Sequence, residues 1–349
     1  MLKAFYYNGL TSIGIESHPN LLKRIAENLE YEIFQDYRID CLIKINQAKQ
    51  PVEIVKDKRF DYLSINREEK DGVTSIRYIR YNTPVRTIHQ INPNNYIVDT
   101  NVSLDEDAGL ICIRKHLNDH PRISNKPLLH ASLIELGNQG ILIPGDSREG
   151  KTTLSVYLLQ EKRATFISDE NVILDLSNGQ VYGLYIPRTI RVRFKTISES
   201  KLEKVLSNIS LTKATQYIDS DAIERIISSR SYNVEAGLAF SRKSFYELLG
   251  SSSKDNTLIN LVIFPKYTPI KKAVITKLTK SEGVYRLGIT GLAKKQDADP
   301  KELGKFPLTL TEKYYNKMEF LELKFSGFES LVKGGVRLWV NPPMKTILV

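Results

Sequence analysis

One segment constrains the fold of this chain more than any other: Gly145-Asp146-Ser147-Arg148-Glu149-Gly150-Lys151-Thr152. It directly follows an apolar run at residues 140–144 and directly precedes a helix-like stretch at residues 153–161. The pattern G-x-x-x-x-G-K-[ST] between a strand and a helix is that of a phosphate-binding loop, the P-loop or Walker A motif. The chain is therefore expected to contain an α/β unit built around this loop.

Each part of the loop has a physical task. Glycines at its two ends let the backbone turn tightly, so that successive N–H groups and the positive end of the helix point at anionic oxygens. Lys151 would place its ammonium on the β and γ phosphates of a nucleotide, and Thr152 would offer its hydroxyl to the accompanying magnesium. The alternative is a glycine-rich turn that matches by chance. The predicted nucleotide-binding residues are Gly145, Asp146, Ser147, Arg148, Glu149, Gly150, Lys151, Thr152 and Thr153.

Composition narrows the class of protein. Of the 349 residues 41% are hydrophobic and 26% charged, which is typical of a folded protein rather than a disordered one. We see no apolar stretch long enough to span a bilayer and no apolar core of a secretory signal, so a cytoplasmic protein is expected. The net charge of +10 favours an anionic partner, which could be a nucleotide, an acidic peptide or a nucleic acid. Cys41 and Cys112 are too few for a metal site or a disulfide framework and are expected to be buried.

The short strand-like runs in residues 1–120 predict an N-terminal α+β domain. One helix is expected at residues 20–30. A second is expected to begin at Ser103, which forms a capping box with Glu106, and to end before Pro121. Segment 121–127 is interpreted as a linker to a second domain at residues 121–349. The strands expected in the first domain are residues 2–7, 37–45, 51–55, 62–65, 73–81, 85–91 and 96–99.

The second domain alternates strands with helices. Residues 190–195 alternate strictly and place Arg191, Arg193 and Lys195 on one strand face. Residues 257–264 form a continuous apolar run typical of a central strand buried on both sides. The other expected strands are 128–136, 139–144, 164–167, 172–176, 181–184, 273–277, 320–325 and 335–340; helices are expected at 151–161, 198–206 and 218–229, and an exposed loop at 293–305.

Two further groups could complete a site around the loop. Asp169 and Glu170 directly follow the strand at residues 164–167, where a magnesium ligand or a proton acceptor would stand; a solvated Asp-Glu turn is the alternative. His130 opens the strand that leads to the loop, and an imidazole can relay a proton near neutral pH, although a lone histidine is often structural. The pair His116 and His120 lacks an acidic third ligand and is interpreted as surface.

Four segments together resemble the catalytic core of HPr kinase/phosphorylase and of the wider group of HPr-kinase-related kinases. They are Leu129-His130-Ala131-Ser132-Leu133, residues 140–147, Gly150-Lys151-Thr152, and residues 167–172. The family pattern is a histidine before a strand, a Gly-Asp-Ser phosphate loop and an Asp-Asp pair after the next strand. The resemblance implies a P-loop-containing α/β fold with a mixed sheet, like that of ATP-dependent phosphoenolpyruvate carboxykinase, preceded here by the N-terminal α+β domain.

The resemblance also implies roles for individual residues. Lys151 and Thr152 would hold phosphates and magnesium, Asp169 would be the catalytic carboxylate that activates the acceptor hydroxyl, and His130 would assist it. Glu170 stands where the family has its second Asp and would be a metal ligand beside Thr152 and Asp169. The family's downstream Glu-Val/Ile-Arg-Gly signature has no counterpart, which argues against HPr itself as substrate and against a reverse phosphorylase reaction.

The sequence therefore predicts a kinase, a phosphotransferase that uses ATP and Mg²⁺. Because the related group includes kinases of a serine in lasso-peptide precursors, the expected acceptor is a serine or threonine hydroxyl of a peptide or protein. A small-molecule kinase acting on free serine or a sugar is the second hypothesis. A nucleotide-gated nucleic-acid-binding NTPase ranks last, because no homeodomain, zinc-finger, RRM or KH pattern is present. ATP versus GTP and assembly into a homo-oligomer stay open.

Overall fold

A computed structural model describes most of the chain, which divides into two compact units. The first unit comprises Met1–Asn125 with Pro187–Thr189, and the second comprises Lys126–Ile186 with Ile190–Val349. None of the described helices is both long and apolar enough to cross a bilayer. The described residues are 2–7, 11–29, 39–47, 63–80, 83–101, 106–119, 126–200, 202, 237–290, 312–334, 337–340 and 345–348.

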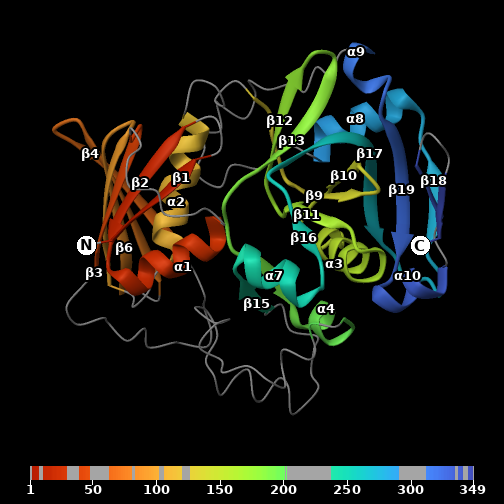
Figure 1. The fold of residues 1–349 in the computed structure, drawn as a ribbon, viewed down its shortest axis with the longest axis horizontal. Helices are drawn as coiled ribbons and strands as arrows, with labels where there is room; N and C mark the ends of the chain where they lie inside the picture. The colour runs from red at the N-terminus through yellow and green to blue at the C-terminus, as the bar shows by residue number, and fades with distance from the viewer. Residues whose placement is uncertain are drawn as a thin grey trace. The chain divides into compact units, whose positions relative to one another are not determined.

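The first unit is a seven-stranded sheet with two helices on one face (Figure 1). The order of strands is β1-β2-β3-β7-β6-β5-β4; β2–β3 and β3–β7 are parallel pairs, and the others are antiparallel. Ile13, Ile43 and Val98 of the sheet are fully buried, and so are Ile25 and Ile113 of the helices. The elements are β1 (Leu2–Tyr7), β2 (Ser12–Ser17), α1 (Pro19–Leu29), β3 (Cys41–Gln47), β4 (Leu63–Lys70), β5 (Val73–Arg80), β6 (Thr83–Asn92), β7 (Asn95–Thr100) and α2 (Glu106–Asp119).

The second unit is built on a ten-stranded mixed sheet with helices on both faces. Its strands are β8 (Leu128–Leu129), β9 (Ala131–Leu136), β10 (Gln139–Pro144), β11 (Thr165–Ser168), β12 (Val172–Ser177), β13 (Gln180–Tyr185), β16 (Ser252–Ser253), β17 (Asn256–Tyr267), β18 (Val274–Lys277) and β19 (Glu319–Phe325). Strands β14 (Ile190–Arg193) and β15 (Gly237–Phe240) form one two-stranded antiparallel sheet, and β20 (Arg337–Val340) and β21 (Lys345–Leu348) form another. The helices are α3 (Lys151–Lys162), α4 (Phe194–Ser198), α7 (Arg242–Leu248), α8 (Lys280–Thr290), α9 (Glu312–Tyr315) and α10 (Phe328–Gly334).

Strand β17 is the central strand of the second unit, as its apolar run predicts. It pairs in parallel with β10 and with β19, which runs beside it in Figure 1. Ile263 joins the core under α3, whereas Val262 joins the core on the opposite face with Leu287 of α8. Alternate residues of one strand thus bury against both helical layers.

Several sequence-based expectations are confirmed or corrected. The mixed α/β class is confirmed. The turns at Asp71-Gly72 and Asn178-Gly179 join paired antiparallel strands, and both residues of each turn have the positive φ of a two-residue type I′ hairpin. The strand expected at 190–195 ends at Arg193, because α4 starts at Phe194. The strand expected at 128–136 is interrupted at His130. Of the helix expected at 198–206, Ser198 is the last residue of α4 and residues 199 and 200 are not helical, whereas residues 201 and 203–206 lie outside the described part of the chain.

Other expectations fall on residues outside the described ones. These are the strand at 51–55, the helix at 218–229, the loop at 293–305, most of the linker at 121–127, and Ser103 with His120. Both cysteines are buried and free, as expected, and burial raises the pKa of Cys41 to about 12. The surface interpretation of His116 is wrong. Its ring is buried and lies 3.1 Å from Thr11 Oγ1, and its Nδ1 lies 3.4 Å from the carbonyl oxygen of Pro93.

The close approach of β10 to β17 gives a stability prediction. A Cβ at Gly140 would lie 2.4 Å from the carbonyl oxygen of Leu258, a backbone atom held in the sheet. Gly140→Ala is therefore expected to lower the free energy of unfolding by roughly 2 to 3 kcal/mol in urea titrations followed by circular dichroism. Gly288→Ala in α8, where no atom of the described residues lies within 4 Å of the added Cβ, is the control and is expected to cost nothing. An unchanged midpoint for Gly140→Ala would contradict this.

Candidate functional site

Three chain segments meet at one edge of the large sheet. Strands β9 and β10 are antiparallel with Ala131 opposite Pro144, so β9 begins where β10 ends. Strand β11 is antiparallel to β9 with Ser168 opposite Leu133, so β11 ends at the same edge. The start of β9, the loop after β10 and the turn after β11 therefore come together, although β9 separates β10 from β11 in the sheet.

The loop after β10 turns sharply into α3. Gly150 has φ 95°, and a Cβ there would lie 2.5 Å from the ring of Phe325, so only glycine fits the position. Lys151 is the first residue of α3, and its side chain is buried inside the loop, with only 6% of the residue exposed. Its Nζ donates to the carbonyl oxygens of Gly145, at 2.8 Å, and Asp146, at 2.9 Å. The ammonium is thus fixed at the centre of the loop.

The surroundings of Lys151 are acidic. Burial lowers the pKa of Lys151 below its usual value, and four carboxylates act in the opposite direction; in decreasing order these are Asp169, Glu170, Glu149 and Asp146. A buried ammonium that is held in place by carboxylates can also bind the anionic oxygens of a ligand. The predicted acidic pair and the predicted lysine are therefore electrostatic neighbours.

Asp169 is buried, with 2% exposed, and two hydroxyl groups contact its carboxylate. Ser132 Oγ donates to Oδ1, and Thr152 Oγ1 donates to Oδ2 at 3.2 Å. A buried carboxylate needs such partners to offset its desolvation. The structure thus brings together Lys151, Thr152 and Asp169. Ser132, which is fully buried, has no predicted role, and its only signal in the sequence is a polar residue inside an apolar strand.

The turn after β11 presents the acidic pair in a constrained conformation. Glu170 has φ 63°, in the left-handed region that non-glycine residues seldom adopt. The turn is closed by the N–H of Asn171, which donates to the carbonyl oxygen of Asp169 at 2.8 Å, and by Ser168 Oγ, which donates to the carbonyl oxygen of Asn171 at 2.6 Å. Glu170 is partly exposed beside the loop.

His130 lies between β8 and β9, where the chain changes its pairing partner. Leu129 pairs with Val172, and Ala131 pairs with Pro144. The backbone of His130 is therefore held between the turn that carries Asp169 and the start of the loop after β10, and its side chain is partly buried.

The remaining loop residues lie on the surface or on α3. Asp146, Ser147 and Arg148 are exposed, and Arg148 has φ 77°. The Thr153 hydroxyl is 2.8 Å from that of Thr196, which connects the first turn of α3 to α4. The expected basic face is present on β14, where Arg191 and Arg193 are exposed. Lys195 lies in α4 instead, and its Nζ donates to the Tyr267 hydroxyl at 2.8 Å.

A magnesium ion fits the donors at this edge. Mg²⁺ prefers hard oxygen ligands and in nucleotide sites takes one or two from protein and the rest from phosphates and water. Thr152 Oγ1 and the Asp169 carboxylate already converge at 3.2 Å. Among the described residues, no group of three or more His, Cys, Asp or Glu side chains could hold a metal ion. The donors present therefore suit an ion that arrives with a phosphate ligand.

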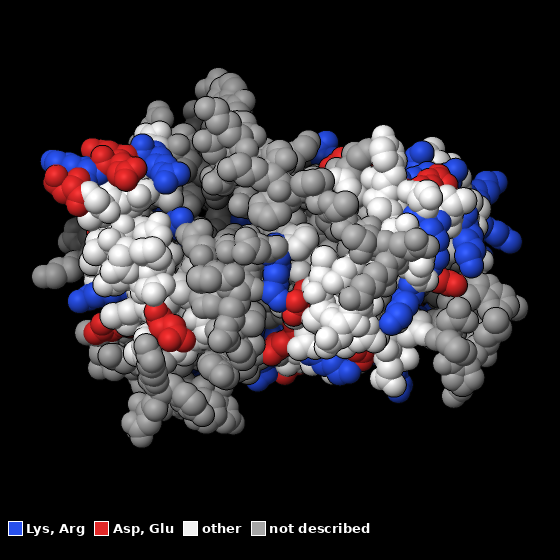
Figure 2. Space-filling view, turned by 90° about the horizontal axis from the view of Figure 1, so that it is seen from above, with Lys and Arg blue, Asp and Glu red and all other residues white. Residues whose placement is uncertain are grey.

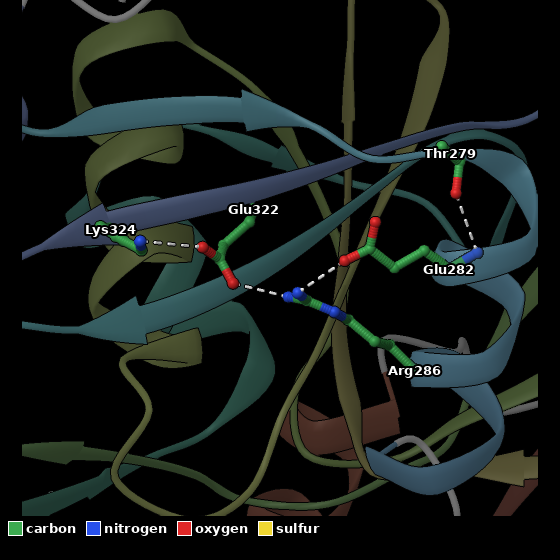
Figure 3. Close-up of polar contacts among 5 residues, drawn as sticks. All are labelled: Thr279, Glu282, Arg286, Glu322 and Lys324. Carbon is green, nitrogen blue, oxygen red and sulfur yellow. Dashed lines mark hydrogen bonds and ion pairs between the residues drawn. The ribbon is translucent and has the colours of Figure 1, made fainter.

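Charged residues of α8, β18 and β19 form a separate group of ion pairs. Arg286 donates to Glu322 at 2.6 Å and to Glu282 at 3.0 Å, as Figure 3 shows, and Lys324 lies 3.3 Å from Glu322. On the face drawn in Figure 2, Lys and Arg side chains of the described residues lie among Asp and Glu side chains. The positive side chains on this face therefore do not form a patch of one sign, which gives little support to a nucleic-acid surface there.

Comparisons with known proteins find distant similarity to solved structures. No protein-family model matches the chain, and no curated protein sequence matches it. Among solved structures, the chain is similar to the Hpr(Ser) kinase/phosphatase from Coxiella burnetii, with 14% sequence identity and a TM-score of 0.26, over 60% of this chain and 95% of that chain. At that identity and TM-score we take neither a residue role nor a substrate from the similarity.

Proposed function

We propose that this protein is an ATP- and magnesium-dependent kinase that transfers the γ-phosphoryl group to a serine or threonine hydroxyl of a peptide or protein. The observation that supports it is the convergence of Lys151, Thr152 and Asp169 at the edge where α3 begins. Phosphoryl transfer requires a cation on the phosphates, a hydroxyl and a carboxylate for magnesium, and a carboxylate that positions the nucleophile. These groups are present within one loop, one helix turn and one strand end.

In the proposed reaction the acceptor oxygen forms a bond to the γ-phosphorus as the bond to the β–γ bridging oxygen breaks. Asp169 takes the proton of the acceptor hydroxyl, His130 assists it, and ADP leaves with the bridging oxygen and its electron pair. Lys151 stabilises charge on the phosphates. Thr152, Asp169 and Glu170 would hold a magnesium ion, which when bound neutralises phosphate charge.

The first test is calorimetry of the full chain with Mg-ATP and Mg-GTP, followed by incubation with γ-labelled ATP and a panel of acceptors. The panel contains serine and threonine peptides, free serine and sugars. The proposal expects nucleotide binding and label on a peptide. Absence of binding for both nucleotides would refute a kinase of this kind, and label on small molecules alone would replace the proposed acceptor class.

Ser132→Ala tests the positioning of Asp169. The variant removes the hydroxyl that donates to Asp169 Oδ1, and phosphoryl transfer is expected to fall about 10- to 100-fold while the Kd for Mg-ATP stays within about twofold. Ser155→Ala is the matched control, because Ser155 is a buried serine of α3 whose Oγ has no hydrogen-bond partner among the described residues. Equal transfer rates for the two variants would show that Ser132 does not position Asp169.

A further inference from the structure

A carboxylate of the chain itself lies inside the phosphate loop. Glu149 Oε2 accepts a hydrogen bond from the backbone N–H of Asp146 at 2.6 Å. The same oxygen is 2.6 Å from the position of a Cβ on Gly145, so it lies directly against the backbone at the start of the loop. The N–H of Glu149 in turn approaches the carbonyl oxygen of Asp146, at 3.3 Å. Residues 146–149 are thus closed by a reciprocal pair of contacts.

The donor that Glu149 uses is one that the proposed function assigns to a nucleotide. Backbone N–H groups of such a loop bind phosphate oxygens because they point at one anion-sized position. Here a carboxylate oxygen, the closest protein equivalent of a phosphate oxygen, satisfies the first of them. Glu149 is also one of the four carboxylates that act on Lys151, the other group a phosphate would contact.

We propose that Glu149 is an internal anion that closes the loop at residues 146–149 and competes with the phosphates of the nucleotide. This inference rests on the proposed function, because it concerns the affinity of that same site. A phosphate oxygen that binds the Asp146 N–H displaces the Glu149 carboxylate, and the two anions repel each other until the side chain leaves the loop. Glu149 therefore sets an upper limit on nucleotide affinity.

Removing the charge tests the proposal. Glu149→Gln keeps the shape of the side chain and an amide oxygen that can still accept from Asp146, but it no longer repels phosphate. The Kd for Mg-ADP and for pyrophosphate with magnesium is expected to fall about tenfold in calorimetric titrations at low ionic strength. Because the repulsion is electrostatic, the gain is expected to shrink as salt is added.

The matched control is Glu161→Gln. Glu161 is an exposed carboxylate in the last turn of α3, where Gln160 Nε2 donates to it at 2.8 Å. The substitution Glu161→Gln changes the net charge by the same amount as Glu149→Gln. Its Kd values are expected to equal those of the unmodified protein. A second variant, Glu149→Ala, removes both the charge and the hydrogen bond and is also expected to bind more tightly. Melting curves without ligand verify that each variant is folded.

The outcomes separate this inference from the proposed function. If the unmodified protein binds Mg-ADP and both Glu149 variants bind it equally or more weakly, Glu149 is not a competitor and only the inference fails. If Glu161→Gln gains as much affinity as Glu149→Gln, the effect is one of overall charge, and again only the inference fails. If no folded protein in the set binds nucleotide or pyrophosphate, the proposed function fails and the inference with it.

Discussion

Lys151→Met is expected to abolish phosphoryl transfer and to weaken Mg-ATP binding by at least roughly 100-fold, since it removes charge-assisted hydrogen bonds to phosphate. The loss is larger than that of the bonds alone. In the native protein the Lys151 ammonium offsets the four carboxylates around it. With methionine in its place, no positive charge reduces the repulsion between those carboxylates and the phosphates. Calorimetry with Mg-ATP and single-turnover label transfer measure the two effects.

The control for this substitution lies at the other end of the same helix. Lys162→Met removes a lysine from the last turn of α3, far along the helix from the loop, and is expected to leave the Kd and the transfer rate unchanged. Methionine at 151 leaves the carbonyl oxygens of Gly145 and Asp146 without the ammonium, so a modest loss of thermal stability is expected as well. A Kd within about threefold of the native value in a folded Lys151→Met protein would show that the loop does not bind phosphates.

The parts of the fold that local patterns determine could be predicted from the sequence. The loop, α3 and β17 follow from a motif and from long apolar or amphipathic runs, and the hairpin turns follow from Asp-Gly and Asn-Gly pairs. Strand β2 was not predicted, because a glycine interrupts Ser-Ile-Gly-Ile-Glu-Ser and lowers its strand signal. Helix α8 was missed although Thr279 and Glu282 form the pattern of a capping box, and Thr279 Oγ1 accepts from the N–H of Glu282 in Figure 3.

The proximity of Lys151 and Asp169 could be predicted from the sequence, but the contacts around them could not. Spacing places Lys151 and Asp169 near each other because a strand end and a helix start share one sheet edge. Spacing gives no information on side-chain partners, so the contacts of the Ser132 hydroxyl and of the Glu149 carboxylate could be found only in three dimensions. His116 shows the same limit: its side chain contacts Thr11, which lies 105 residues away in the chain.

Asp169→Asn is expected to stop phosphoryl transfer, with the rate falling roughly 1000-fold, while nucleotide affinity changes little. Asparagine has the same shape, and its amide oxygen can still accept from Ser132 or Thr152, so the site keeps its packing. It cannot take the proton of the acceptor hydroxyl. The measurement is the single-turnover rate of label transfer to a peptide acceptor together with the Kd for Mg-ATP.

Asp175→Asn on β12 is the matched control, because Asp175 pairs with Lys126 and lies outside the site. This variant is expected to transfer phosphate at the native rate.

The affinity measurement separates the two roles that Asp169 could have. If Asp169 acts mainly on the acceptor, the Kd for Mg-ATP stays within about threefold and only the rate falls. If it acts mainly as a magnesium ligand, the Kd for Mg-ATP rises while that for ATP without magnesium does not. Near-native transfer by Asp169→Asn would contradict both roles. The buried carboxylate, which is hydrogen-bonded to two hydroxyl groups, would then have a structural role only.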